Sequence, residues 1–296
     1  MANYMHRLFW WFANSTYKWW PDALWLKMIY RQRLHRSLEL KAPRRFTDKL
    51  NWLKLHDHNP LYTSLVDKYE VKQYIKDFLG EQMVIPSYGV WDSFDDIDFD
   101  KLPTQFILKC THDSGRFCIC KDKAAFDIAA AKMKMEKSLK NNFFWWTREW
   151  PYKNVRPRII AEKLMVDGES DALTDYKFFC FNGEPRMMYV SKDVSTDPRT
   201  DFFDMDWNHL PFRIKDPQAD VMPEKPALFN EMREIACKLS MGIPHVRVDL
   251  YVINGQIYFG EMTFFHNSGI FNITPDEWDY KIGEWLELPK SIPLSQ

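Results

Sequence analysis

The chain contains 296 residues, of which 46% are hydrophobic and 16% aromatic, and its formal net charge is −1. This length allows one large domain or two lobes around a cleft, and the hydrophobic content excludes an intrinsically disordered protein. No G-x-G-x-x-G, G-x-x-x-x-G-K-[ST], H-E-x-x-H or G-x-S-x-G pattern occurs, which excludes the Rossmann and P-loop fingerprints and the most easily recognised metalloprotease and hydrolase motifs.

The near-zero net charge hides an uneven distribution along the chain. Residues 1–54 contain eleven Lys or Arg against three Asp or Glu, which gives +8 and leaves −9 for the remainder. A basic N-terminal segment on an acidic body indicates an anionic partner, either a nucleic acid or a membrane surface. No nucleic-acid-binding motif accompanies the basic residues, so we expect no nucleic-acid partner.

Residues 1–45 are predicted to form a basic, Trp-rich, amphipathic helical arm with two runs separated by Pro21. The apolar positions of the first run are Met1, Tyr4, Met5, Leu8, Phe9 and Phe12. In the second run, one side carries Leu24, Trp25, Met28 and Ile29, and the other carries Lys27, Arg31, Arg33 and Arg36. This pattern is typical of a helix that lies in a membrane interface, and neither run reaches the ~20 apolar residues that span a bilayer. The alternative is that the apolar sides pack on the body as ordinary core.

The cellular location is predicted from the first residues and the cysteines. The Trp-rich, Pro-interrupted start lacks the clean apolar segment of a secretory signal peptide. Five cysteines occur without a C-x-x-C motif, which indicates reduced thiols. We therefore expect a cytoplasmic protein that lies peripherally at the inner face of the cell membrane, where the arm contacts the membrane surface.

Helices and short strands alternate after the arm. Residues 46–80 are predicted to be helical, with Asp67 and Glu70 at a capped helix start and Gly80 at the end. The next predicted elements are an acidic loop at 92–100, strands at 106–110 and 117–120, a helix at 124–139 and a strand at 158–165. Two hairpins with Asn-Gly turns follow, at 176–190 and 246–265, with an amphipathic helix at 226–239 between them. This mixture predicts an α+β fold with mostly antiparallel sheets.

The second hairpin carries one carboxylate near the middle of each apolar strand, Asp249 and Glu261. Isolated buried carboxylates are unfavourable, so they normally pair with a cation or bind a metal ion. Two facing carboxylates suit Mg²⁺ that carries a nucleotide phosphate. The alternative is a cross-strand ion pair between Arg247 and Glu261, with Asp249 at a surface.

The register of this hairpin decides whether the two carboxylates meet. A two-residue turn would pair Ile253 with Gln256 and place the carboxylates on opposite faces. A three-residue turn would pair Val252 with Gln256, set Glu261 opposite Arg247 and bring both carboxylates to one face. The sequence leaves both registers open.

Five ordered blocks then resemble the TupA-like ATP-grasp family, which is named for teichuronopeptide biosynthesis. The resemblance covers about residues 45–290 and rests on residues 106–110 with Ser114-Gly115, 160–163, 175–183, 247–251 and 259–264. It implies an ATP-grasp fold, with an ATP site between two lobes of mostly antiparallel sheet with helices. The expected organisation is the arm at 1–45, a helical or mixed region at 46–105, a first lobe at 106–190 and a second lobe with the Mg²⁺ site at 191–296.

The resemblance also implies roles for particular residues. ATP contacts are expected from Lys109, Ser114, Gly115, Glu162, Lys163, Leu164, Glu169 and Lys177. Here Lys109 and Lys177 would contact phosphates, Ser114-Gly115 would close over them, residues 162–164 would hold adenine, and Glu169 would bind ribose. Arg247 and Lys177 are the expected catalytic residues, and Asp249, Glu261 and Thr263 the expected Mg²⁺ ligands. His266, Asn267, Ser268 and Gly269 would lie near the acceptor substrate.

Two positions depart from the family pattern. Thr263 stands where many ATP-grasp enzymes have an Asn that completes a second Mg²⁺ site, so the sequence leaves the number of Mg²⁺ ions open. His266-Asn267 replaces a Pro-Ala pair, which leaves the acceptor open.

The function implied by the family is ATP-dependent, ADP-forming ligation of a carboxylate to an amine such as an amino acid. The family name indicates a uronic acid of a surface or capsule polysaccharide, or of its lipid-linked precursor. Residues 1–40 would then contact the membrane surface or this lipid-linked glycan. The alternatives are an ATP-grasp kinase that phosphorylates a sugar hydroxyl and a non-catalytic, membrane-associated scaffold of polysaccharide assembly.

Overall fold

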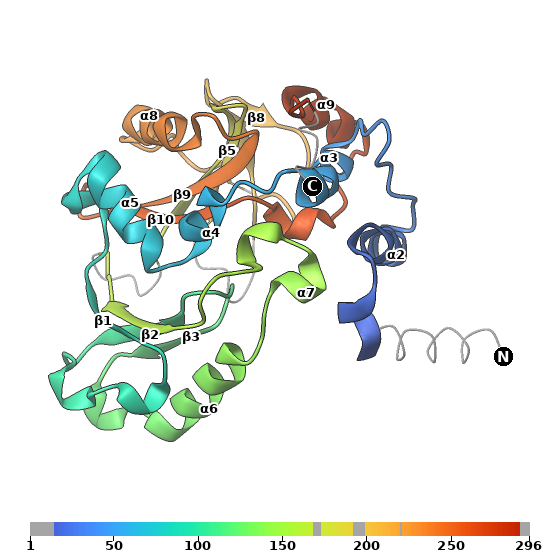
Figure 1. Ribbon diagram of the computed structural model, residues 1–296. Helices are drawn as coiled ribbons and strands as arrows, with labels where there is room; N and C mark the ends of the chain where they lie inside the picture. Colours follow the sequence, from blue (N-terminus) through green and yellow to red (C-terminus); the bar gives the residue numbers. More distant parts are fainter. Residues whose placement is uncertain (1–14, 168–172, 192–198, 220, 291–296) are drawn as a thin grey trace.

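The computed structural model describes residues 15–167, 173–191, 199–219 and 221–290 (Figure 1). The first predicted amphipathic run, up to Phe12, lies outside these residues. The helices are α2 (Asp22–Leu34), α3 (Phe46–His56), α4 (Leu61–Val66), α5 (Glu70–Leu79), α6 (Ile128–Leu139), α7 (Phe144–Thr147), α8 (Phe229–Ser240) and α9 (Glu277–Trp285). The strands are β1 (Ser87–Trp91), β2 (Phe106–Cys110), β3 (Phe117–Cys120), β4 (Ile159–Lys163), β5 (Asp175–Phe181), β6 (Glu184–Ser191), β7 (Phe202–Asp204), β8 (His209–Leu210), β9 (His245–Ile253) and β10 (Gln256–Thr263).

The described strands form two antiparallel sheets. One has four strands in the order β1-β4-β2-β3, and the other has six in the order β10-β9-β5-β6-β7-β8. The predicted α+β fold of two mostly antiparallel sheets with helices is therefore confirmed. Strands β5 and β6 belong to the six-stranded sheet, so a division of the lobes by sheet falls between Lys163 and Asp175 rather than at residue 190.

The four-stranded sheet packs on α6 with one face and turns the other toward the six-stranded sheet (Figure 1). In β2, Phe106, Leu108 and Cys110 are buried in a core cluster with residues of α6. Successive side chains of a strand point to opposite faces. Ile107 and Lys109 accordingly line a pocket on the other side.

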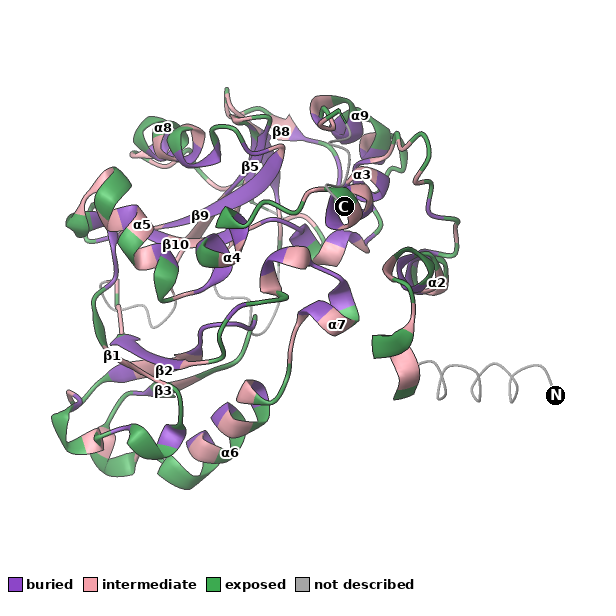
Figure 2. Ribbon diagram, in the orientation of Figure 1, coloured by how far each residue is buried: buried purple, intermediate pink, exposed green. Residues whose placement is uncertain are grey.

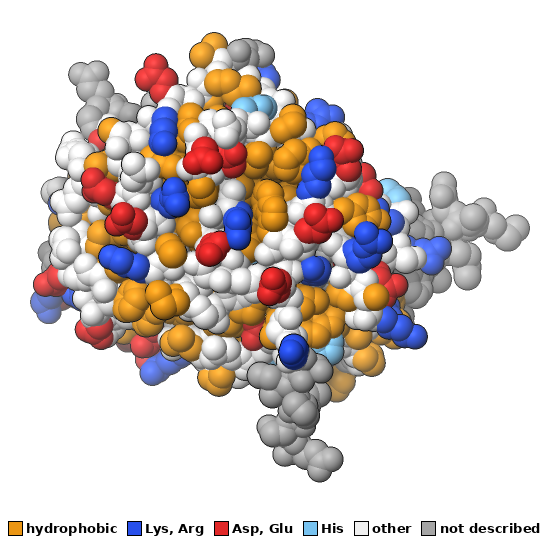
Figure 3. Space-filling view, turned by 90° about the horizontal axis from the view of Figure 1, so that it is seen from above, with side chains coloured by type: hydrophobic (Ala, Val, Ile, Leu, Met, Phe, Trp, Pro, Cys, Tyr) orange, Lys and Arg blue, Asp and Glu red, His pale blue; other side chains and the backbone are white. Residues whose placement is uncertain are grey.

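The six-stranded sheet contains most of the core, and its strands β5 and β9 are mainly buried (Figure 2). Helix α8 packs on one face through Met232, Ala236 and Leu239. Basic and acidic side chains are interspersed over the face that Figure 3 shows, which is the view from above. This face therefore carries no extended region of one charge.

The segment 46–80, which was predicted to be helical, contains three helices. Helix α3 ends at His56, α4 begins after Pro60, and α5 begins after a turn in which Asp67 Oδ1 accepts hydrogen bonds from two backbone N–H groups. Pro60 interrupts the pattern because proline lacks the backbone N–H that a helix interior requires. The predicted capped start at Asp67 is present.

Helix α2 packs on the body of the protein. Trp25, Leu26, Ile29, Tyr30 and Leu34 form a buried cluster. The Trp25 indole N–H donates to the Trp146 carbonyl at 2.9 Å. The predicted packing alternative therefore holds for most of the apolar side of this helix, whereas Leu24 is exposed.

Ion pairs also hold the segment 22–36 on the body of the protein. Arg148 contacts Asp22 at 2.6 Å, and Arg36 contacts Asp279 of α9 at 2.6 Å. Arg36, predicted on the outer basic side, thus turns inward to a buried carboxylate. Among the described residues, no helix is long and apolar enough to cross a membrane.

Candidate active site

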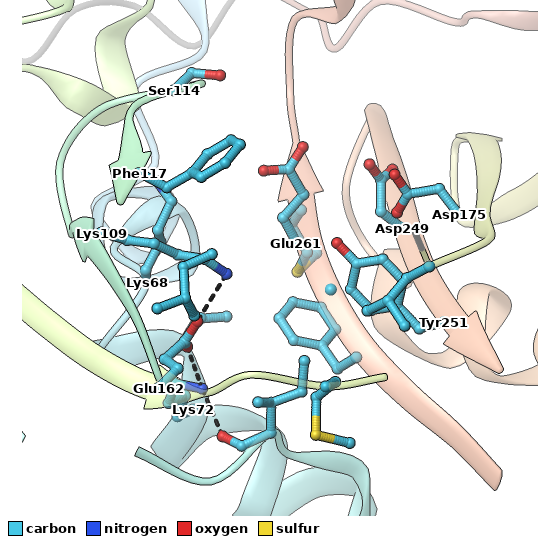
Figure 4. A pocket seen from close by; sticks show the side chains of 18 of the residues that line it. Lys68, Lys72, Lys109, Ser114, Phe117, Glu162, Asp175, Asp249, Tyr251 and Glu261 are labelled. Carbon is cyan, nitrogen blue, oxygen red and sulfur yellow. Dashed lines mark hydrogen bonds and ion pairs between the residues drawn. The ribbon is translucent and has the colours of Figure 1, made fainter. Parts of the chain in front are cut away.

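A pocket of about 460 Å³ lies between the two sheets. On one side lie Lys68, Lys72, Lys109 and Glu162; we call this the lysine wall. On the other side, β5, β9 and β10 present Asp175, Asp249 and Glu261; we call this the carboxylate wall (Figure 4). A site with cations on one wall and anions on the other can hold a polyanion together with a divalent cation.

Glu162 is the centre of the lysine wall. Its carboxylate lies 2.7 Å from Lys109 Nζ and 2.6 Å from Lys72 Nζ (Figure 4). Burial alone would raise the pKa of Glu162, but the two ammonium groups outweigh burial and hold the pKa below its ordinary value. Lys72 also donates to the Ile85 carbonyl at 2.7 Å. Three lysines against one glutamate give the lysine wall two positive charges in excess, which favours the binding of phosphate.

Lys68 and Lys72 were not among the site residues predicted from the sequence. Lys72 lies in α5, and Lys68 lies just before that helix and donates to the Asp113 carbonyl of the β2–β3 loop. Their spacing of four residues next to a capped helix start is the one signal for a shared face. Nothing local shows that this face meets β4, because that contact spans about 90 residues of sequence.

The predicted phosphate loop joins β2 to β3 at the rim of the pocket. Ser114, Gly115 and Arg116 all line the pocket. Gly115 has φ +78°, a backbone conformation that favours glycine, and no atom lies within 4 Å of the position that a Cβ would occupy. The loop base is fixed because the Thr111 N–H donates to the Arg158 carbonyl at 2.9 Å.

The predicted adenine segment lies beside the lysine wall. Lys163 and Leu164 line the pocket directly after Glu162. The Lys163 backbone N–H donates to the Pro86 carbonyl at 2.9 Å, so this group is already used within the protein. Glu169, the predicted ribose-binding acid, lies outside the described residues.

The register of β9 and β10 combines features of both predicted alternatives. The turn has two residues, because Ile253 pairs with Gln256. A bulge at Gly260 then shifts the register by one residue, and Glu261 comes directly opposite Asp249. The two carboxylates therefore share one face despite the two-residue turn.

Gly260 allows this bulge by its lack of a side chain. A Cβ at this position would lie 2.9 Å from the Asp249 carbonyl oxygen and 2.9 Å from the Tyr251 ring. Contacts under 3.0 Å are essentially never made by real Cβ atoms. Any side chain here would push the two strands apart at the carboxylate pair.

Asp249 is held by two cations. Its oxygens accept from Arg247 Nε at 2.6 Å, from Arg247 Nη2 at 2.7 Å and from Lys177 Nζ at 2.6 Å. Its side chain is 1% exposed. Burial alone would raise the pKa of Asp249, but the cations of Arg247 and Lys177 outweigh burial and lower it. Asp249 is thus an ionised carboxylate in the interior rather than a surface acid.

Glu261 and Thr263 complete this group of side chains. Arg247 Nη2 lies 3.0 Å from Glu261 Oε1, and the Thr263 hydroxyl donates to the same oxygen at 3.1 Å. The Glu261 side chain is 45% exposed and faces the pocket. The predicted Arg247–Glu261 ion pair therefore exists, but beside a buried Asp249.

The donor set fits a Mg²⁺ ion that is shared with phosphate oxygens. Asp249 and Glu261 face each other across the strand pair, and the nearby Asp175 has a buried Oδ1 without a hydrogen-bond partner. No group of three His, Cys, Asp or Glu residues arranged to hold a metal occurs in the described part of the chain. Mg²⁺ is commonly bound in this way, by one or two carboxylates together with substrate phosphates.

The predicted acceptor loop forms the 3-10 helix η7 (His266–Gly269) behind the carboxylate wall. None of His266, Asn267, Ser268 and Gly269 is among the residues that line the pocket. His266 is buried, with Nδ1 2.7 Å from Arg247 Nη1, whereas Asn267 is exposed. The structure thus brings His266 to Arg247 rather than to the nucleotide pocket.

Comparison with solved structures shows distant likenesses. The chain is similar to a D-alanine–D-alanine ligase from Bacillus anthracis (TM-score 0.40, 18% identity) over 68% of this chain and 57% of that one. The corresponding Helicobacter pylori ligase gives TM-score 0.38 and 15% identity over 75% and 61% of the two chains. An N5-carboxyaminoimidazole synthase from Aspergillus clavatus, in complex with ADP, gives a TM-score of 0.39 and 11% identity. This match covers 69% of this chain and 46% of that one. At these TM-scores the likeness is too low to transfer a substrate or mechanism.

Two further comparisons use the sequence. A search of curated proteins found no match. The chain spans 57% of the Bacillus anthracis ligase, less than two thirds of its length. The model of the family described as TupA-like ATPgrasp matches residues 48–287, which include both sheets and both walls of the pocket. The chain therefore belongs to the TupA-like ATP-grasp family.

Proposed function

We propose that this protein is an ATP-dependent, ADP-forming ligase that joins a carboxylate to an amine. The observation that supports this proposal most strongly is the pocket itself, which has a volume of about 460 Å³ and in which the lysine wall faces Asp249 and Glu261. Cations opposite paired carboxylates suit a nucleotide triphosphate with its metal ion. Membership of an ATP-grasp family agrees with this assignment.

Each wall has a distinct role in this proposal. Lys72, Lys109 and the Ser114-Gly115 loop bind the phosphates, and Lys163 with Leu164 borders the adenine. Mg²⁺ held by Asp249 and Glu261 would offset the negative charge of the phosphoryl group. Lys177 and Arg247 position these carboxylates and supply further positive charge where the phosphate is transferred.

The reaction proceeds in two steps. An oxygen of the substrate carboxylate attacks the γ-phosphorus of ATP, the bond to the β-phosphate oxygen breaks, and an acyl-phosphate and ADP form. The amine then attacks the acyl carbon, phosphate leaves, and the amine loses a proton. A loop closed over the phosphates would exclude the water that would otherwise hydrolyse the acyl-phosphate.

The family name supports a uronic acid of a surface or capsule polysaccharide, or of its lipid-linked precursor, as the carboxylate. The test supplies the purified chain with Mg-ATP, uronic acids and a panel of amino acids, and measures ADP. We expect ADP release to require both a carboxylate and an amine. A phosphorylated sugar formed without amine would indicate a kinase instead. If the protein binds Mg-ATP but consumes no ATP with any combination of carboxylate and amine, a non-catalytic scaffold would be favoured.

We also propose that the N-terminal segment holds the protein at the inner face of an anionic membrane, as a peripheral cytoplasmic protein. Trp19 is 88% exposed and Leu24 45% exposed, and Lys18, Lys27 and Arg31 are exposed beside them. Indole and leucine side chains next to basic groups match the apolar and anionic layers of such a bilayer. Because α2 is fastened to the body, this surface has a fixed orientation relative to the pocket.

Liposome flotation tests this surface. We expect the full chain to float with vesicles that contain anionic lipid and not with neutral vesicles. The double variant Trp19→Ala/Leu24→Ala should reduce flotation several-fold. The control Met241→Ala removes an exposed apolar side chain at the end of α8, outside the N-terminal segment, and should leave flotation unchanged. Equal flotation of both variants, or of neutral and anionic vesicles, would refute the proposal.

A further inference from the structure

The loop after β10 has an unusual backbone. Asn267, Ser268 and Gly269 are consecutive residues with φ of +44°, +53° and +59°. For residues other than glycine such a conformation is unfavourable and persists only where the surroundings fix it. The loop therefore needs specific contacts to hold its shape.

Ser268 receives these contacts from two buried charged residues. Lys54 Nζ donates to the Ser268 carbonyl at 2.7 Å, and the Ser268 hydroxyl donates to Glu149 Oε1 at 2.6 Å. Asn51 Nδ2 donates to the Gly269 carbonyl at 2.7 Å. A lysine and a glutamate in the interior, from distant parts of the chain, thus hold one serine at both its backbone and its side chain.

The clamped loop places His266 against Arg247. The imidazole is buried and packs edge-on against Phe179 at 5.0 Å and Phe271 at 5.4 Å between ring centroids. Its Nδ1 lies 2.7 Å from Arg247 Nη1. An arginine side chain offers only donors, so Nδ1 must carry a lone pair and the proton of a neutral ring must sit on Nε2. The Asn267 amide lies 3.2 Å from Nε2 and can turn its oxygen to accept that proton.

The other two nitrogens of the Arg247 guanidinium contact the predicted Mg²⁺ ligands. Nε and Nη2 contact Asp249, and Nη2 also contacts Glu261 and Thr263. The bond to His266 is on Nη1, at the opposite side of the guanidinium. His266 and the carboxylates therefore fix the plane of this group from both sides.

We propose that His266 is a positioning residue that acts as a neutral hydrogen-bond acceptor and orients the Arg247 guanidinium, and that Lys54 and Glu149 hold it there through Ser268. This inference rests on the proposed role of Arg247 in phosphoryl transfer. A general base would need a free ring nitrogen that faces the substrate, whereas Nδ1 of His266 is occupied by Arg247. Burial and the nearby guanidinium lower the pKa of His266 well below its ordinary value, in agreement with a neutral ring.

The first test is the protonation state of His266 in the full chain, by nitrogen NMR of labelled histidine. The resonance is assigned from its absence in His266→Asn. We expect an unprotonated Nδ1 and a protonated Nε2 from about pH 5 to about pH 8, the range in which ordinary histidines titrate. A protonated Nδ1 would overturn the proposal whatever reaction the protein catalyses.

The second test compares three substitutions in the ADP-release assay. The Oδ1 atom of asparagine lies at the position of Nδ1, so His266→Asn keeps the acceptor in place. His266→Gln moves the acceptor one bond further out, to the position of Nε2, and His266→Leu has none. We expect kcat within about threefold of wild type for His266→Asn, and about 10²-fold lower for the other two with little change in the KM for ATP. Thermal unfolding identifies any variant that does not fold. If either His266→Gln or His266→Leu does not fold, the other still tests the loss of an acceptor at the position of Nδ1.

Equal kcat for all three variants, or equal loss in all three, would show that the acceptor at Nδ1 does not matter and would refute the positioning role. If the wild-type chain forms no ADP with any carboxylate and amine, the proposed function fails. The NMR result still decides whether His266 accepts from Arg247.

Discussion

Glu261 lies directly across the strand pair from Asp249, although the two-residue turn of their hairpin would place them on opposite faces. The bulge at Gly260 shifts the register by one residue and so changes the face to which Glu261 points. In a strand with a period of two, a shift by one residue moves every following side chain to the other face. A single small residue therefore creates the carboxylate pair of the proposed metal site.

Gly260→Ala should disrupt this arrangement. The new Cβ meets the Asp249 carbonyl oxygen and the Tyr251 ring at 2.9 Å, so we expect a loss of about 1–3 kcal/mol in the free energy of unfolding. The displaced Glu261 should also abolish thermal stabilisation by Mg-ATP. Gly242→Ala is the control, because Gly242 has φ +75° but no atom within 4 Å of the Cβ position, so alanine strains the backbone there without a clash. This variant should lose some stability but keep its full stabilisation by Mg-ATP. If Gly260→Ala retains full stabilisation by Mg-ATP, the bulge does not build the site.

Asp249→Asn and Glu261→Gln test the metal ligands themselves. Both substitutions remove a negative charge without changing the shape, so thermal stabilisation by Mg-ATP should fall strongly relative to each variant's own melting temperature. Asp249→Asn should also lower stability without ligand, because Arg247 and Lys177 lose their buried partner. Glu277→Gln, on an exposed ion pair with Lys281, should behave as wild type. Equal stabilisation of the wild type and both site variants would contradict the metal assignment.

The buried residues Lys54 and Glu149 should depend on each other. Lys54→Met removes the donor to the Thr147 and Ser268 carbonyls and the cation near Glu149, and we expect a loss of about 1–3 kcal/mol in urea unfolding. Burial raises the pKa of Glu149 and the charge of Lys54 opposes that rise. The double variant with Glu149→Gln should therefore lose less than the sum of the single variants. Lys281→Met, at an exposed pair, should lose less than about 1 kcal/mol. Strict additivity for Lys54 and Glu149 would show that the two charges are not coupled.

His245 should give the protein a defined sensitivity to acid. Burial lowers the pKa of His245 to about 3 in the folded protein, whereas the unfolded chain has an ordinary value of about 6.5. The unfolded state therefore binds the proton first, so stability is fully present above about pH 6.5 and decreases as the pH falls toward 3. We expect a loss of about 2 kcal/mol between pH 7 and pH 5 from this residue.

Urea unfolding of His245→Asn measures this contribution. The Asn amide can replace the Nδ1–H bond to the Cys180 carbonyl, which is 2.9 Å long in the wild type, and it does not titrate. The variant should lose less stability between pH 7 and pH 5 than the wild type. Substitution of the exposed His35 by Asn should leave the wild-type dependence unchanged. Identical pH profiles for wild type and His245→Asn would contradict the assignment.

The sequence predicts local features of this fold well. The two Asn-Gly hairpins form, with φ of +50° at Asn182 and +52° at Asn254. The strand predicted at 106–110 forms as β2, in which Leu108 is buried and Lys109 lines the pocket. The capped helix start at Asp67 is also present. Each of these features depends on residues within a few positions of one another.

Features that depend on distant contacts were not predicted. Helix α9 was missed because its stability rests on long-range partners: buried Asp279 accepts from the Thr47 N–H at 2.9 Å and from Arg36 at 2.6 Å. Strand β1 was missed because its pairing partner, β4, is about 70 residues away. Within the site, the contact of Lys72 with Glu162 and the bulge at Gly260 depend on how the sheets pair and pack, so the local sequence does not predict them.

The central claim is that ATP activates a carboxylate as an acyl-phosphate in this pocket. The most direct measurement uses uronic acids labelled with ¹⁸O in the carboxyl group, together with Mg-ATP and a panel of amino acids, and determines the label in the inorganic phosphate by mass spectrometry. Our account predicts ADP and phosphate that carries one oxygen from the carboxylate. Formation of AMP, or ADP formation with unlabelled phosphate or with phosphate retained on the sugar, would contradict it.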